Sequence, residues 1–269
     1  VGLSQPWRFV IVDDSARRAA VRDNFALCNA QALAAQDSCR ASSYARLKLA
    51  GLDEAPLPLD EVIEIGSRVA TALHDLHADL SARFTEFGGW QMPVRYGSIL
   101  EEHRAVRTAA GLFDVSHMGL IEVGGADSVR FLGRVLTLRP DAIPVNYARY
   151  AFLLNEKGGI KDDLMAFRLN EERFILVVNA SNTDKDFAWV QSQAGKFDAA
   201  VTNASPRTAQ IAIQGPRSLE ILQPFVDGLD LAPIKYYWYG YGTVLGERCL
   251  VARTGYTGED GFEVYLKPE

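Results

Sequence analysis

The pattern of apolar and polar positions changes between residues 53 and 72. Before this region, residues 8–12 form a short apolar run that predicts a buried strand. Residues 13–15 (Asp-Asp-Ser) then supply capping side chains for an alanine-rich stretch, which predicts helix to about residue 52. Two prolines within residues 53–58 end any helix and mark a turn or linker. We therefore expect three parts: a mostly helical segment over residues 1–56, a linker over residues 57–71 and a second domain over residues 72–269.

In the second domain, strand and helix patterns alternate, which predicts an α+β fold. Strands are expected at residues 120–123, 150–155, 160–169, 173–179, 249–253 and 262–266. Helices are expected at residues 127–136, with Val129, Leu132 and Leu136 on one face, from the cap at residues 182–184 to about Gly195, and from Gly215-Pro216 onward. Turns are expected at residues 158–159, 170–172 and 254–261.

The composition is typical of a soluble globular protein, since 48% of the 269 residues are apolar and 23% are charged. No apolar run reaches membrane-spanning length and no export signal is visible, so we expect a cytoplasmic protein with no membrane partner. The formal net charge of −6 offers phosphate backbones no attraction, so we expect no nucleic-acid partner. The aromatic run at residues 236–241 is accordingly assigned to the protein core rather than to base stacking.

Side chains that bind metals or activate nucleophiles show none of the usual spacings. The histidines contain no HExxH pair and the cysteines no CxxC pair, so we expect no metal site and reduced thiols. His103 is interpreted as a surface residue and His117 as a structural one. No GxSxG motif, P-loop or strand-linked GxGxxG supports a serine hydrolase, a nucleotide hydrolase or a dinucleotide oxidoreductase.

Two neighbouring aspartates lie inside the apolar strand predicted at residues 160–169. With a period of two, Asp163 shares a face with Met165 and Phe167, whereas Asp162 lies on the other face, so Asp163 is expected on the more apolar side. A partly buried carboxylate has a raised affinity for protons, which suits a general base or a group that stabilises charge at an amine. On the pattern alone, a structural carboxylate satisfied by backbone donors or by an arginine is the favoured alternative.

Glu263 is the single carboxylate in the last predicted strand. It alternates with Phe262, Val264 and Leu266. The same alternation is expected of an ordinary solvent-facing residue, so the pattern leaves the role of Glu263 open.

Five segments of the second domain carry a more specific signal. They are FGGWQMPVRY at residues 87–96, GLFDVSHM at 111–118, LNEKGGIKDDL at 154–164, VNASN at 178–182 and TGYTGEDGFE at 254–263. In residues, order and spacing they resemble successive signatures of the T-protein (aminomethyltransferase) family of the glycine cleavage system. The resemblance covers residues 71–269 and implies the folate-binding T-protein fold. It also implies transfer of a methylene carbon from aminomethyl-lipoyl H-protein to tetrahydrofolate, with release of ammonia.

The resemblance assigns roles to particular residues. Asp163 matches the family's catalytic aspartate, which orients the folate nitrogens and stabilises or removes a proton. Glu263 matches the pterin anchor, because a carboxylate offers two acceptors to adjacent N–H donors. The other positions that match the family's folate pocket are Tyr150, Met118, Asn179 and Tyr256. Phe167 stands where a tyrosine is common, so one hydroxyl contact is not expected. Tetrahydrofolate is therefore the expected acceptor substrate and lipoylated H-protein the expected partner.

Members of this family continue beyond the equivalent of residue 269, through a helix with an arginine for the folate tail and into a further domain. We therefore expect an incomplete fold with uncovered apolar surface. A non-catalytic folate-binding or inert fragment is the first alternative function. Demethylating dehydrogenases such as dimethylglycine oxidase have a similar folate-binding portion, but FDVSHM together with GYTGEDG favours the T-protein family.

The first segment carries a separate resemblance. VGLSQPWRFV at residues 1–10 and YARLKLAGLDEAP at residues 44–56 resemble the dimethylbenzimidazole synthase branch of the flavin nitroreductase family. This implies a fragment of that fold, with Gly2 and Ser4 as remnants of a turn near the flavin. The arginine-rich phosphate contacts and the later half of that family are missing, so no complete FMN site is expected. An FMN-dependent nitroreductase-like protein is the second alternative function.

Overall fold

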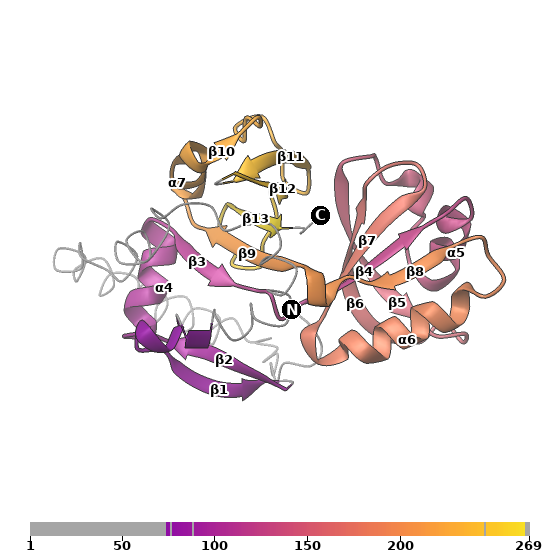
Figure 1. Ribbon diagram of the computed structural model, residues 1–269, viewed down its shortest axis with the longest axis horizontal. Coiled ribbons are helices and arrows are strands. Elements are labelled where there is room, and N and C mark those ends of the chain that lie inside the picture. The colour runs from indigo at the N-terminus through magenta and orange to yellow at the C-terminus, as the bar shows by residue number, and fades with distance from the viewer. Residues whose placement is uncertain (1–73, 76, 88, 245, 267–269) are drawn as a thin grey trace, which may run out of the picture.

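The computed structural model describes residues 74–266 except residues 76, 88 and 245 (Figure 1). The expectations for residues 1–56 and for the linker over residues 57–71 lie outside these residues. Antiparallel strands form three sheets of two, five and six strands, with helices packed against them. The predicted α+β class is therefore confirmed for the described part of the chain.

The five-stranded sheet has the strand order β5-β6-β7-β4-β8. Its strands are β4 (Gly119–Gly124), β5 (Tyr147–Leu154), β6 (Ile160–Arg168), β7 (Arg173–Val178) and β8 (Ala200–Asn203). The expected turn between β6 and β7 is present, because the backbone N–H of Leu169 donates to the carbonyl of Arg173 at 2.8 Å. β5 begins three residues earlier than expected, since Tyr147 already pairs with Arg168 at the far end of β6. These pairings place β6 inside the sheet.

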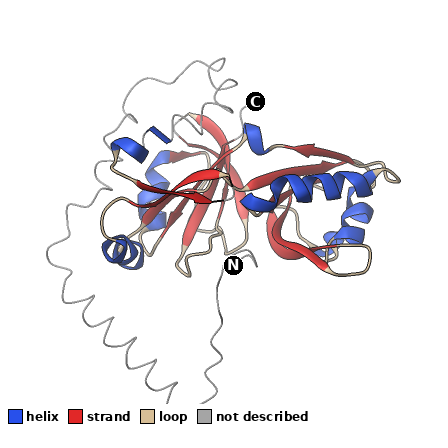
Figure 2. Ribbon diagram, turned by 90° about the horizontal axis from the view of Figure 1, so that it is seen from below, coloured by secondary structure: helices blue, strands red, loops and turns tan. Residues whose placement is uncertain are grey.

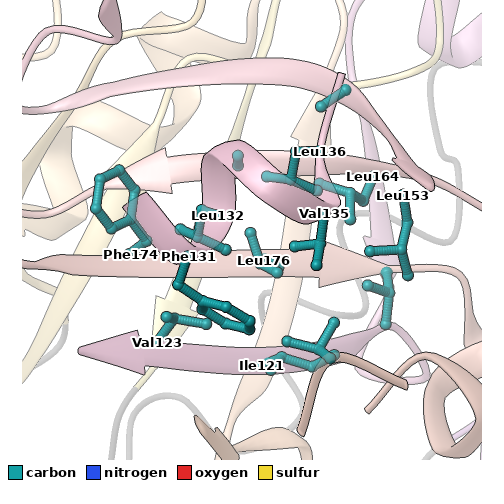
Figure 3. Close-up of a cluster of buried hydrophobic side chains, with 14 of the residues drawn as sticks. Ile121, Val123, Phe131, Leu132, Val135, Leu136, Leu153, Leu164, Phe174 and Leu176 are labelled. Carbon is teal, nitrogen blue, oxygen red and sulfur yellow. The ribbon is translucent and has the colours of Figure 1, made fainter. Parts of the chain in front are cut away.

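Two helices cover one face of this sheet. They are α5 (Ser128–Val135) and α6 (Thr183–Ala194). Figure 2 shows the long helix α6 lying against the sheet. Figure 3 shows Phe131, Leu132 and Val135 of α5 packed against strand residues such as Ile121. The sequence placed Val129 on this face, but Val129 is only partly buried and Phe131 occupies the centre of the contact.

The six-stranded sheet has the order β10-β11-β12-β13-β9-β3. Its strands are β3 (Gly111–Asp114), β9 (Ala209–Gln214), β10 (Val226–Asp227), β11 (Tyr239–Val244), β12 (Glu247–Ala252) and β13 (Gly261–Leu266). The predicted hairpin of β12 and β13 is confirmed. The helix expected from Gly215-Pro216 begins later, as α7 (Ser218–Leu222). Gly215 instead passes so close to the backbone before β3 that an added Cβ would lie 2.5 Å from the carbonyl oxygen of Ala109.

The remaining elements join and flank these sheets. They are the two-stranded sheet of β1 (Arg83–Phe87) and β2 (Trp90–Arg95), helix α4 (Ile99–Thr108), and the short 3-10 helices η2 (Pro140–Ala142), η3 (Ala180–Asn182), η4 (Ser205–Arg207) and η5 (Gln223–Phe225). Within the described residues, no helix combines the length and apolar character needed to cross a membrane.

The two larger sheets pack against each other through one buried cluster, here called the inter-sheet layer. Its buried members are Leu120, Ala148, Met165, Phe167 and Val177 from the five-stranded sheet, Tyr239, Leu250, Ala252 and Tyr265 from the six-stranded sheet, and Ala204. The Tyr239 hydroxyl also hydrogen-bonds the carbonyl oxygen of Arg168, which ties β11 to the end of β6. Both faces of the five-stranded sheet are thus covered, one by helices and the other by the second sheet.

The assignment of residues 236–241 to the core is wrong for two of its tyrosines. Tyr239 is buried in the inter-sheet layer, but Tyr236 and Tyr241 are exposed. Tyr236 lies in the turn before β11. Tyr241 follows Tyr239 by two positions on the same strand and lies beyond the covered area, with its ring at right angles to that of Tyr239. Burial in this run is therefore set by how far the opposite sheet extends.

The core on the helix-covered side of the five-stranded sheet can be tested by substitution. Ile121→Val removes one methylene group from a fully buried side chain of β4, so we expect a loss of about 1 kcal/mol in the free energy of unfolding. Ile160→Val, at an exposed position of β6, is the matched control and should change stability by less than half as much. Urea unfolding of both variants measures the difference, and equal losses would contradict the assigned core.

Candidate functional site

The Asp163 carboxylate lies on the side of β6 that faces the inter-sheet layer and is held by two side chains. The Tyr150 hydroxyl, from the neighbouring strand β5, donates to Oδ2 of Asp163 at 2.8 Å. The Asn179 amide, directly after β7, donates to Oδ1 at 3.0 Å. Three adjacent strands therefore bring these expected site residues together, because alternate residues of paired strands share a face.

Asp162 is as deeply buried as Asp163, with exposed fractions of 5% and 6%. The sequence places Asp163 on the more apolar side, but the burial of the two carboxylates does not differ, because β6 is an interior strand whose two faces are both covered. Asp162 points to the helix-covered face that also holds Leu164 and Ala166. The Asn179 amide donates to Asp162 Oδ1 at 2.9 Å as well, so one amide group bridges the two carboxylates.

Tyr150 presents a half-exposed ring beside the buried carboxylate. Burial, followed by the hydrogen bond to Asp163, raises the pKa of the Tyr150 hydroxyl to about 12. The hydroxyl therefore keeps its proton at neutral pH and acts as a donor to Asp163. The ring is positioned by an edge contact with Phe152, at 5.4 Å between ring centroids. Its exposed side is free to contact a flat ligand.

Glu263 is buried on β13, and this excludes the solvent-facing alternative that the sequence left open. Gln210 donates to its Oε1 at 3.3 Å, Tyr265 donates to its Oε2 at 3.3 Å, and the Thr254 hydroxyl also bonds Oε2. Burial raises the pKa of Glu263, although the three hydrogen bonds act in the opposite direction. A carboxylate has about four acceptor positions, so it retains capacity for a further donor.

Tyr256 lies near both carboxylate groups of the site. Its ring is exposed, but its hydroxyl lies within electrostatic range of Glu263, Asp163 and Tyr150. Burial of the hydroxyl, followed by the charge of Glu263, raises the pKa of Tyr256. Met118 packs against the inter-sheet layer as a partly buried side chain. The structure thus gathers the six residues singled out in the sequence at the junction of the two larger sheets.

Three buried polar residues in or near the site were not singled out in the sequence. Gln210 and Gln214 are buried glutamines in the apolar strand β9, an unusual pattern that could have marked them. Asp186 lies in the first turn of α6, where an acidic residue is ordinary because it complements the helix dipole. Its complete burial, described below, depends on packing that the local sequence does not encode.

The histidine, cysteine and carboxylate side chains of the described residues do not come together as a metal site. Within the described residues, no group of three or more histidine, cysteine, aspartate or glutamate side chains is arranged to hold a metal ion. Cys249 is a buried free thiol, and His103 is exposed as expected. Burial lowers the pKa of His117, which favours its neutral form and agrees with a structural role.

Comparisons with known proteins identify relatives of this chain. Aminomethyltransferase from Desulfitobacterium hafniense (strain DSM 10664 / DCB-2) is 52% identical over 199 residues, which make up 74% of this chain and 54% of that protein. Aminomethyltransferase from Moorella thermoacetica is 49% identical over 197 residues, covering 73% of this chain and 54% of that protein. The crystal structure of glycine cleavage system aminomethyltransferase T from Bartonella henselae superposes with a TM-score of 0.67 at 38% identity, over 73% of this chain and 53% of that one.

The chain therefore spans about half the length of the curated relatives it matches. The resemblance of the second domain to aminomethyltransferases is confirmed by these relatives. The family model described as the GCVT N-terminal domain matches residues 73–269, which include both larger sheets and every residue of the site. The chain belongs to the family of the GCVT N-terminal domain.

Proposed function

We propose that this chain provides the folate-binding and catalytic portion of an aminomethyltransferase of the glycine cleavage system. Its acceptor substrate is tetrahydrofolate, and the donor is the aminomethyl group carried by the lipoyl arm of H-protein. The observation that carries the proposal is the Asp163 carboxylate, buried beside the inter-sheet layer and held by Tyr150 and Asn179. Such a group has a fixed position and a charge that solvent screens little.

Asp163 assists the steps of the transfer that take place at the folate nitrogen. Two tetrahydrofolate nitrogens bond in turn to the donor carbon, while the bonds of this carbon to the amino nitrogen and to the lipoyl sulfur break. The two folate N–H protons end on the departing ammonia and on the lipoyl thiol, and the first of them is lost by the attacking nitrogen. Asp163 orients that nitrogen, stabilises the positive charge and accepts the proton. Tyr150 and Asn179 hold its two oxygens, so the carboxylate does not have to reorganise during the reaction.

Glu263 anchors the pterin ring in this proposal. Its buried oxygens accept hydrogen bonds from the adjacent amino and ring N–H groups of the pterin edge. The exposed rings of Tyr150 and Tyr256 offer faces for stacking, while Met118 and the Asn179 amide line the same junction. A cytoplasmic location, the absence of an FMN site and the absence of a nucleic-acid partner stay predictions.

Titration calorimetry with tetrahydrofolate tests this assignment. We expect measurable binding to the wild-type chain and binding weaker by about 10- to 100-fold for Glu263→Ala, because hydrogen bonds to a charged group are lost. Glu247→Ala, at an exposed position of the adjacent strand β12, is the matched control and should bind like the wild type. Equal affinities of Glu263→Ala and the control would remove Glu263 as the anchor. No binding to the wild-type chain would overturn the proposed function.

A further inference from the structure

A third aspartate is buried behind the site, on the helix-covered face of β6. Asp186 belongs to the first turn of α6 and its exposed fraction is 0%. Among the described residues, neither carboxylate oxygen of Asp186 accepts a well-formed hydrogen bond, although the Lys185 ammonium lies 3.5 Å from Oδ1, and Oδ2 of Asp162 also lacks a donor. Three buried carboxylate oxygens without a well-formed hydrogen bond would cost several kcal/mol, so this arrangement requires a physical explanation.

A retained proton supplies that explanation. The Asp186 and Asp162 carboxyl groups are in hydrogen-bonding contact, and two such buried groups do not both ionise. A protonated carboxyl group is a donor, so one proton between the two groups satisfies oxygens on both. Burial, followed by the hydrogen bond and the negative charge of Asp162, raises the pKa of Asp186 to about 8. Asp186 is therefore the member that carries the proton at neutral pH.

Neither of the two charged groups that face Asp186 removes the need for this proton. They are Asp162 from β6 and Lys185 from α6 itself. The Lys185 ammonium lies 3.5 Å from Oδ1 of Asp186 and acts to lower the pKa of that carboxyl group, but it is half-exposed, it also donates to the backbone carbonyl of Lys161, and its effect is smaller than those of burial and of Asp162. The Lys161 ammonium in turn lies over the Trp189 ring, at 4.5 Å from its centroid.

We propose that Asp186 is a positioning residue for Asp163, acting through a chain of hydrogen bonds. Asp186 donates its carboxyl proton to Asp162. The other oxygen of Asp162 accepts from Asn179, and the same amide nitrogen donates to Asp163. The two N–H groups of Asn179 are shared among Asp162 Oδ1, Asp163 Oδ1 and, at 3.2 Å, the backbone carbonyl of Asp163, so the charge on Asp162 affects how strongly the amide holds Asp163. This inference rests on the proposed function only for the role of Asp163 in the transfer.

Two substitutions distinguish the role of Asp186 as a hydrogen-bond donor from its role as a titrating group. Asp186→Asn keeps an N–H donor for Asp162, whereas Asp186→Leu has a similar shape and no donor. In Asp186→Leu, Asp162 lacks its second partner and draws the Asn179 amide away from Asp163. We expect transfer by Asp186→Leu to be slower by about tenfold in kcat and by Asp186→Asn to stay close to wild type. Asp184→Asn, at an exposed position of the same helix, is the control.

Two spectroscopic measurements, made in the absence of folate, test the inference. The infrared band of a protonated carboxyl group should be present in the wild-type chain at pH 6 and absent from both Asp186 variants. The side-chain amide signals of Asn179 in nuclear magnetic resonance spectra, identified by their loss in Asn179→Gln, should move in Asp186→Leu and stay near the wild-type positions in Asp186→Asn. The absence of the infrared band, or unchanged amide signals in Asp186→Leu, would overturn the proposal.

A titration keeps the inference testable if Asp186→Leu does not fold. In the wild-type chain, the Asn179 amide signals should shift as the pH rises through about 8, and in Asp186→Asn this shift should be absent. A flat wild-type titration contradicts the proposal. A wild-type chain that shows these signals but does not bind tetrahydrofolate would retain the shared proton and its control of Asn179, while the proposed function fails.

Discussion

Asp163→Asn is expected to lower the rate of tetrahydrofolate-dependent transfer by about 10²- to 10⁴-fold, the usual contribution of a general acid or base. Asparagine keeps the shape of the side chain but removes the negative charge and the ability to accept a proton. It also offers one acceptor oxygen where Tyr150 and Asn179 each donate to a separate carboxylate oxygen. The loss should therefore fall on kcat, because Glu263, the proposed pterin anchor, is untouched.

Single-turnover measurements with aminomethylated H-protein and saturating tetrahydrofolate give this rate. Tyr150→Phe is the informative comparison, since it removes one hydrogen bond to Asp163 and leaves the charge in place. Its rate should fall by about tenfold, the effect of one hydrogen bond to a charged group. Wild-type turnover in Asp163→Asn would exclude Asp163 as the catalytic residue. A larger loss in Tyr150→Phe than in Asp163→Asn would transfer the proton-accepting role to the tyrosine.

Two parts of the fold lie close to their predicted bounds because a nearby turn or cap determines them. The pair β6 and β7 is joined by residues 169–172, and its alternation of apolar residues and polar turn was sufficient to place both strands. The helix α6 begins after Asn182 and ends before Gly195, as its capping residues indicate. In each case the turn or cap that determines the element lies within a few residues of it.

Burial was harder to predict, because it depends on which surface covers each strand. Period two correctly separates Asp162 from Asp163, but it does not show that helices cover one face of β6 and a second sheet the other. The same limit applies to Glu263, whose three hydrogen-bond donors come from β9, β13 and the loop before β13. Local alternation assigns a side chain to a face of the strand, and long-range packing determines the environment of that face.

The contact between the buried side chains of Asp162 and Asp186 also could not be predicted from local alternation. They are separated by a strand, a turn and the first turn of a helix, and nothing in the local sequence around either residue indicates that the two meet. α6 packs on the helix-covered face of the five-stranded sheet, and its first turn brings Asp186 to Asp162 of β6. Since burial and the neighbouring charge change the proton affinity of Asp186, the consequence should appear in the stability of the whole domain.

The free energy of unfolding of the wild-type chain is expected to fall, relative to that of Asp186→Asn, as the pH rises from about 4 to about 8. In the folded chain the pKa of Asp186 is raised from 3.8 to about 8, so in this window the folded state holds a proton that the unfolded state has released. Each pH unit therefore favours unfolding, by up to about 1.4 kcal/mol. Below this window both states hold the proton, and above it neither does, so the difference levels off at both ends.

Urea unfolding of both proteins at pH 5, 6, 7 and 8 measures this difference without any substrate. Asparagine at position 186 has no proton to release, and its amide still donates to Asp162, so the variant should lose the pH-dependent term and keep the hydrogen bond. Asp184→Asn removes an exposed carboxylate from the same helix, and its stability should run parallel to that of the wild type. If Asp186→Asn also runs parallel to the wild type, Asp186 is ionised in the folded chain and the two buried carboxylates share no proton.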